Sequence, residues 1–104
     1  MEAAKVGVSI ILVDASNRIL VGVRKGSHGE GLLAVPGGHI EFFEEFEVTC
    51  NRELREEIGI NFPGQYESIG FSEDFFPEEG KHYITLYFSV NVDSDKFVVQ
   101  NLEP

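Results

Sequence analysis

The segment from Glu44 to Ile58 constrains the fold most, because it has neither glycine nor proline and is rich in Glu, Arg and Leu. Such a composition favours a helix, and Gly59 after it is typical of a helix C-terminus. At 100° per residue, three carboxylates fall within an arc of about 100°: Glu53, Glu56 and Glu57. The adjoining arc is apolar and holds Cys50, Leu54 and Ile58. The segment is therefore predicted to be an amphipathic helix with stacked acids beside its buried face.

Apolar runs on both sides of this helix predict β-strands. They are Val6–Val13, Ile19–Val23, Leu32–Val35, Tyr66–Phe71, His82–Val92 and a short Phe97–Val99. Pro36-Gly37-Gly38 is expected to end the third run, and Asp74–Lys81 is expected to be a loop because it holds Pro77 and Gly80. With 104 residues, the chain is predicted to form one mixed α+β domain, residues 1–104, with one helix set among strands.

Charge and cysteine content narrow the function classes. The formal net charge is −10, which disfavours general nucleic-acid binding because the surface repels polyphosphate. The one cysteine, Cys50, leaves no intrachain disulfide, so a reducing cytoplasm is expected, with Cys50 buried. The N-terminal residues lack a signal-peptide pattern, and Val6–Val13 is too short to span a membrane. We therefore expect a cytoplasmic protein without membrane association.

The stacked acids need an explanation, because like charges at i, i+3 and i+4 destabilise a helix. They also crowd the negative end of the helix dipole. One explanation is a hard divalent cation, since Mg²⁺ prefers carboxylate oxygens, water and phosphate. The other is a solvated acidic face. The adjacent glycines Gly37 and Gly38, set before the helix, favour the cation because glycine allows a backbone oxygen to approach a ligand closely.

The same residues resemble the Nudix signature, G-x5-E-x7-R-E-U-x-E-E-x-G-U, in which U is apolar. Gly38, Glu44 and the run Arg52–Ile60 match all its fixed positions. Val21–Ser27, Leu33–Glu41 and His82–Thr85 look more loosely like the MutT-like nucleoside triphosphate diphosphatase branch. The chain departs from the family at the position before Glu44, which is often glycine in relatives and is Phe43 here.

The resemblance implies a Nudix-type α/β/α sandwich with a mixed sheet. Because related domains continue further, we expect the C-terminal helix to be missing and one face of the sheet to be exposed. An exposed apolar face favours self-association. We therefore expect that the chain either forms a homodimer or is a fragment of a longer product. Glu53 and Glu57 are implied as the principal Mg²⁺ ligands (Mn²⁺ is an expected substitute), with Glu56 as a further ligand or an orienting group. The carbonyl of Gly37 or Gly38 would complete the coordination.

The resemblance also implies roles in support and catalysis. Arg52 would pair with Glu44 and hold the loop against the helix. Glu53 or Glu56 would take a proton from the attacking water. Four residues are implied as substrate contacts: Arg24, Lys25, Val35 and His39. For Arg24 and Lys25, a solvated loop entry is the alternative. For His39 the alternative is an ordinary surface position, and for Val35 it is an ordinary core position.

The implied reaction is hydrolysis of a nucleoside triphosphate to the monophosphate and pyrophosphate. Two alternatives stay open. One is another nucleoside diphosphate-linked substrate, because the signature binds only the shared diphosphate and metal. The other is a non-hydrolytic nucleotide-binding module.

Overall fold

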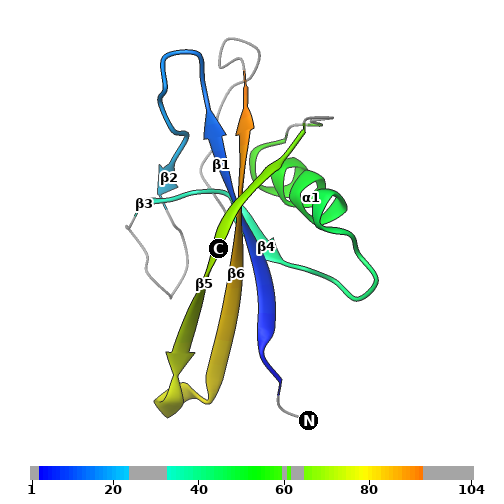
Figure 1. Ribbon diagram of the computed structural model, residues 1–104, viewed down its shortest axis with the longest axis vertical. Coiled ribbons are helices and arrows are strands. Elements are labelled where there is room, and N and C mark those ends of the chain that lie inside the picture. Colours follow the sequence, from blue (N-terminus) through cyan, green and yellow to red (C-terminus); the bar gives the residue numbers. More distant parts are fainter. Residues whose placement is uncertain (1–2, 24–32, 60, 62–64, 93–104) are drawn as a thin grey trace.

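The computed structural model describes residues 3–23, 33–59, 61 and 65–92. Four strands form one mixed sheet in the order β4-β1-β6-β5 (Figure 1). They are β1 (Lys5–Val13), β4 (Gly37–His39), β5 (Glu67–Phe76) and β6 (Lys81–Asn91). The short strands β2 (Gly22–Val23) and β3 (Leu33–Ala34) form a separate antiparallel pair. The sheet is thus mixed, as the sequence predicts.

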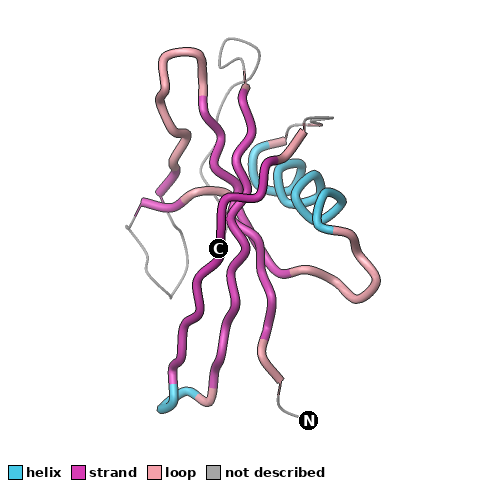
Figure 2. Tube along the Cα trace, viewed as in Figure 1, coloured by secondary structure: helices cyan, strands magenta, loops and turns pink. Residues whose placement is uncertain are grey.

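The two long central strands, β1 and β6, run parallel in a register that pairs Val8 with Leu86 and Ile10 with Phe88. The 3-10 turn Pro77–Glu79 connects β5 to β6, and these two strands pair antiparallel. Strand β4 pairs antiparallel with β1. In Figure 2 the strands (magenta) lie together and α1 (cyan) lies to one side of them. The short strand β4 therefore occupies one edge of the sheet, and β5 occupies the other.

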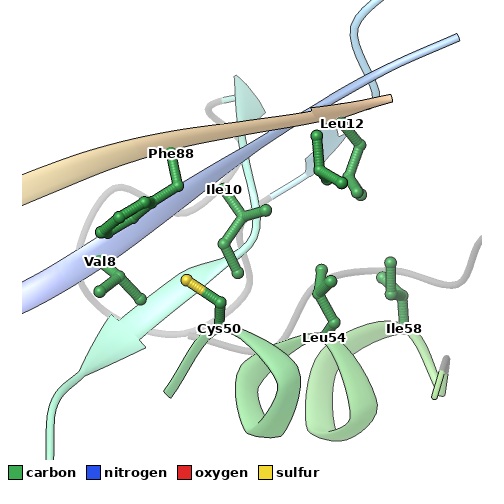
Figure 3. Close-up of a cluster of buried hydrophobic side chains, with 8 residues drawn as sticks. Val8, Ile10, Leu12, Cys50, Leu54, Ile58 and Phe88 are labelled. Atoms are coloured by element: carbon green, nitrogen blue, oxygen red, sulfur yellow. The ribbon is translucent and has the colours of Figure 1, made fainter. Parts of the chain in front are cut away.

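Helix α1 (Phe46–Ile58) packs on one face of the sheet through an apolar core. Figure 3 shows Cys50, Leu54 and Ile58 on α1 pointing toward the side chains of β1 and β6. The buried residues are Val8, Ile10, Leu12, Cys50, Leu54, Ile58, Phe88 and Val90. The predicted apolar face of the helix is confirmed, and so is the burial of Cys50. Burial raises the pKa of the Cys50 thiol to about 12.

The structure corrects several predicted boundaries. The helix begins at Phe46 rather than at Glu44, with Glu45 as its N-cap. Strand β5 continues to Phe76, so the residues from Asp74 to Phe76 were wrongly predicted as loop. Their backbone is satisfied by pairing with the facing residues of β6, which outweighs the low strand propensity of acidic residues.

The glycine pair and the second strand also differ from expectation. Gly37 and Gly38, expected only to end the third apolar run, themselves form part of β4. The run Ile19–Val23 pairs with β1 only through one bridge between Val13 and Ile19. The expected strand Phe97–Val99 lies outside the described residues. Among the described residues there is one α-helix, and no helix is long and apolar enough to cross a membrane.

Candidate metal and substrate site

The site forms where the edge strand β4 meets the last turns of α1. Glu53 faces Gly38 so closely that a Cβ atom at residue 38 would overlap the Glu53 carboxylate. A Cβ at Gly37 would likewise overlap the carbonyl oxygen of Val8. Only glycine fits at Gly37, where the obstacle is backbone, and glycine at residue 38 lets the Glu53 carboxylate lie against the strand.

Backbone pairing with β1 decides which carbonyl group of the glycine pair is available to bind a ligand. The amide of Ile10 donates to the Pro36 carbonyl at 2.8 Å, and Val8 pairs with Gly38 in the same register. In an antiparallel ladder, bonded and non-bonded pairs alternate. The carbonyl of Gly38 is therefore directed to β1, whereas that of Gly37 is directed to the outer edge.

Two hydrogen bonds agree with this alternation. The amide of Gly37 donates outward to Oε1 of Glu57 at 3.4 Å. The carbonyl of His39 accepts a hydrogen bond from Nη2 of Arg52 at 2.8 Å. The edge of β4 that faces away from β1 is thus hydrogen-bonded to side chains of α1, and the Gly37 carbonyl lies on that same edge.

Arg52 is the centre of the polar network beside this edge. Its Nε and Nη2 donate to the two carboxylate oxygens of Glu44 at 2.8 and 3.0 Å, which is a bidentate pair. Its Nη1 donates to Oε1 of Glu53 at 2.6 Å and to Oε2 of Glu56 at 3.4 Å. The neighbouring carboxylates hold the pKa of Arg52 above its usual value. One guanidinium therefore joins the entry loop, β4 and the stacked acids.

Glu44 is anchored from several directions although it precedes the helix. Its Oε1 accepts from the Glu41 amide at 3.0 Å and from the Thr49 hydroxyl at 2.7 Å. The Arg52 pair and these two hydrogen bonds lower the pKa of Glu44 to about 2. Glu44 thus stays ionised and fixes the loop between β4 and α1.

The three stacked acids differ in their surroundings. Glu53 is buried, Glu57 is half-buried and Glu56 is exposed. In the described part of the chain, no three His, Cys, Asp or Glu side chains converge closely enough to hold a metal by themselves. Two carboxylates, the Gly37 carbonyl, water and substrate phosphate are the oxygen donors that Mg²⁺ commonly takes. The donor set at this edge fits such an ion.

An open pocket of about 480 Å³ extends from these acids across the β4 edge. Its walls include the following residues that the resemblance had implicated: Val35, Gly37, Gly38, His39, Glu53 and Glu56. Ser9 and Thr85 also line it, and sequence reasoning missed them. No motif marks them, because they become neighbours only through the parallel pairing of β1 with β6. Arg24 and Lys25 lie outside the described residues.

Comparison with known proteins shows which family the chain resembles. The family model described as NUDIX domain matches residues 3–103. The ADP-ribose pyrophosphatase of Methanocaldococcus jannaschii is 30% identical over 81 residues, which are 78% of this chain and 47% of that protein. The human m7GpppN-mRNA hydrolase NUDT17 is 34% identical over 95 residues, which are 81% of this chain and 29% of that protein. The chain spans less than half the length of these two relatives.

A solved structure shows the same arrangement of elements. The MutT NUDIX hydrolase from Burkholderia pseudomallei superposes with a TM-score of 0.79 at 25% identity. The match covers 88% of this chain and 69% of that one. The sheet with α1 on one face is therefore the shared architecture.

Proposed function

The chain belongs to the Nudix family, and from this premise we propose that it is a Mg²⁺-dependent hydrolase of nucleoside triphosphates. The products are the nucleoside monophosphate and pyrophosphate. The observation that carries the proposal is the convergence of Glu53 and Glu57 on the free edge of the Gly37-Gly38 strand. The adjoining pocket supplies room for a nucleotide beside these oxygen donors.

Glu53, Glu57 and the Gly37 carbonyl would hold the metal, with Glu56 as a further ligand or an orienting group. When bound, Mg²⁺ (or Mn²⁺) would neutralise charge on the diphosphate and lower the pKa of a water molecule. The cation also accounts for how a chain with a net charge of −10 accepts a polyanion. General nucleic-acid binding stays disfavoured, because the described lining of the pocket adds acidic side chains and neither Lys nor Arg.

The protein residues supply orientation and proton transfer. Arg52 fixes the carboxylate of Glu53 through a 2.6 Å contact and is itself fixed by Glu44. A held carboxylate is a better positioned base than a mobile one. Glu53 or Glu56 accepts the proton of the attacking water, since both carboxylates line the pocket.

A second substrate class is favoured by one specific observation. The 30% identical relative from Methanocaldococcus jannaschii is named an ADP-ribose pyrophosphatase. A nucleoside diphosphate-linked sugar presents the same diphosphate to the same edge. We therefore place ADP-ribose beside the triphosphates as the alternative substrate.

Product release from a nucleotide panel tests the proposal. The panel holds the common ribo- and deoxyribonucleoside triphosphates and ADP-ribose, each with Mg²⁺ and with a chelator. We expect Mg²⁺-dependent pyrophosphate release from at least one triphosphate. Turnover of ADP-ribose alone would replace the first substrate class with the second. No turnover of any member would leave a nucleotide-binding module and overturn the hydrolase.

Substitutions on α1 test the assigned roles. Glu57→Gln keeps size and the ability to accept from Gly37 while removing the charge, so activity should fall steeply. Glu47→Gln changes an exposed acid in the first turn of the same helix and should leave activity unchanged. Equal activity in both variants would remove Glu57 from the site.

A further inference from the structure

Three aromatic rings lie in a row on the face of the sheet opposite α1. The ring of His39 on β4 is nearly parallel to that of Tyr83 on β6, with centroids 5.8 Å apart and an interplanar angle of 12°. Phe76 on β5 meets the ring of Tyr83 edge-on, with the two ring centroids 5.9 Å apart. The planes of these side chains are thus set by contacts across several strands.

Strand β1 places a glycine beside the His39 ring. His39 pairs with Gly7, and Tyr83 pairs with Lys5 on the far side of β1. A Cβ atom at Gly7 would lie 3.5 Å from Cδ2 of His39 and 3.0 Å from the carbonyl oxygen of Gly38. A side chain at residue 7 would therefore crowd the β4 backbone and contact the His39 ring. Glycine at this position leaves the His39 ring room beside β1.

His39 belongs at the same time to the pocket that holds the acids. Its side chain is exposed and lines that pocket together with Ser9 and Thr85. Thr85 lies two residues from Tyr83 on the same face of β6. The pocket therefore has a carboxylate end at Glu53 and Glu56, and an aromatic end at His39.

We propose that His39 stacks the nucleobase of the substrate and that Tyr83 is the positioning residue that fixes the plane of the His39 ring. This inference rests on the proposed function, since it takes the carboxylate end as the diphosphate subsite. Every nucleobase has a π-face, so stacking is tolerant of base identity. The aromatic end of the pocket accordingly recognises the presence of a base and discriminates weakly between adenine and guanine.

The test compares the binding of AMP and of ribose 5-phosphate, which lacks only the base, to the full chain with Mg²⁺. Histidine ring-proton signals are followed by NMR, with the His39 signals assigned by their loss in His39→Phe. In the unsubstituted protein, AMP should bind more tightly than ribose 5-phosphate. It should also shift the His39 signals upfield through the ring current of the base, whereas ribose 5-phosphate should not.

Variants separate stacking from folding. His39→Leu should weaken AMP binding roughly 5- to 150-fold, the range given by loss of one base–aromatic stack. His39→Phe should retain most of the affinity. Tyr83→Leu should weaken AMP binding and Tyr83→Phe should restore it. All four should bind ribose 5-phosphate equally well.

Phe75→Leu is the matched control, because Phe75 is an exposed aromatic of the same hairpin and pairs with His82 on the face opposite Tyr83. It should leave AMP binding unchanged. Equal affinity for AMP and ribose 5-phosphate in the unsubstituted protein, or equal losses in Phe75→Leu and Tyr83→Leu, would overturn the proposal. Base-dependent binding without hydrolysis would overturn only the proposed activity. Hydrolysis without base-dependent binding would overturn only the stacking.

Discussion

At the scale of single residues, Phe43 has the least favourable backbone next to the site. Its φ is 67°, in the left-handed region, and its side chain is 93% exposed. The family often has glycine at this position, and the observed backbone gives the physical reason, since glycine adopts positive φ without steric cost. The loop between β4 and Glu44 therefore keeps its path at some expense in stability.

Phe43→Gly is expected to raise the free energy of unfolding by roughly 1 kcal/mol, because the left-handed conformation costs a non-glycine residue about 1–2 kcal/mol and little packing is lost. Urea unfolding measures the change. Phe42→Gly is the matched control: Phe42 is 90% exposed and lacks a positive φ, so glycine there should bring no gain. An equal effect of the two substitutions would show that the backbone at Phe43 carries no strain.

Glu44 predicts a pH dependence of stability with a definite sign. Its pKa falls from an ordinary value of 4.5 to about 2 because Arg52, the Glu41 amide and Thr49 bind the ionised form. A depressed pKa stabilises the fold fully above about pH 4.5, and the contribution is lost as the pH falls towards 2. The unfolding midpoints of the unsubstituted protein and Glu44→Gln should therefore differ at pH 7 and converge near pH 2. A constant difference over this range would contradict the assignment.

Residue-scale contacts were only partly predictable. The pairing of Glu44 with Arg52 was expected from the resemblance and is present. The contacts of Arg52 with Glu53 and with the His39 carbonyl were not foreseen. They depend on the distance between β4 and α1, which is set by the two glycines and by packing across the sheet rather than by spacing along the chain.

At the scale of elements, α1 is held by the apolar face that the helical periodicity predicts. Leu54 is fully buried in the core that α1 forms with the sheet. Leu54→Ala should lower the free energy of unfolding by about 2–5 kcal/mol, because it removes transfer energy and leaves a cavity. Thermal or urea unfolding measures it.

Val48→Ala is the control on the same helix. Val48 is 50% exposed, so its truncation should change stability by no more than about 0.5 kcal/mol. Similar losses in Leu54→Ala and Val48→Ala would mean that α1 does not pack on the sheet through the face described.

The strands were less predictable than the helix. The length of β5 depends on pairing with β6, a long-range interaction that local composition does not contain. The strand character of Gly37 and Gly38 depends likewise on β1. The stack of His39 on Tyr83 depends on the strand order β4-β1-β6. The helix and its acidic residues could be predicted from residue types and spacing. The aromatic end of the pocket could not, because it depends on the order of the strands.

At the scale of the whole molecule, the edge strand β5 carries four large apolar side chains that are exposed. They are Ile69, Phe71, Phe75 and Phe76. An edge strand of this kind favours pairing with another chain. We therefore predict a concentration-dependent homodimer by sedimentation velocity, shifted to monomer by a double Phe71→Ser and Phe75→Ser substitution. A monomer at every concentration would contradict self-association.

Mg²⁺ binding measured by isothermal titration calorimetry tests the central claim most directly, because it needs no knowledge of the substrate. Three proteins are compared: the unsubstituted chain, Glu57→Gln at the β4 edge and Glu47→Gln in the first turn of α1. We predict that Glu57→Gln weakens Mg²⁺ binding at least about tenfold through loss of a charged oxygen ligand, while Glu47→Gln leaves it unchanged. Equal Mg²⁺ affinity in all three proteins would contradict a metal site between Glu57, Glu53 and the Gly37-Gly38 strand.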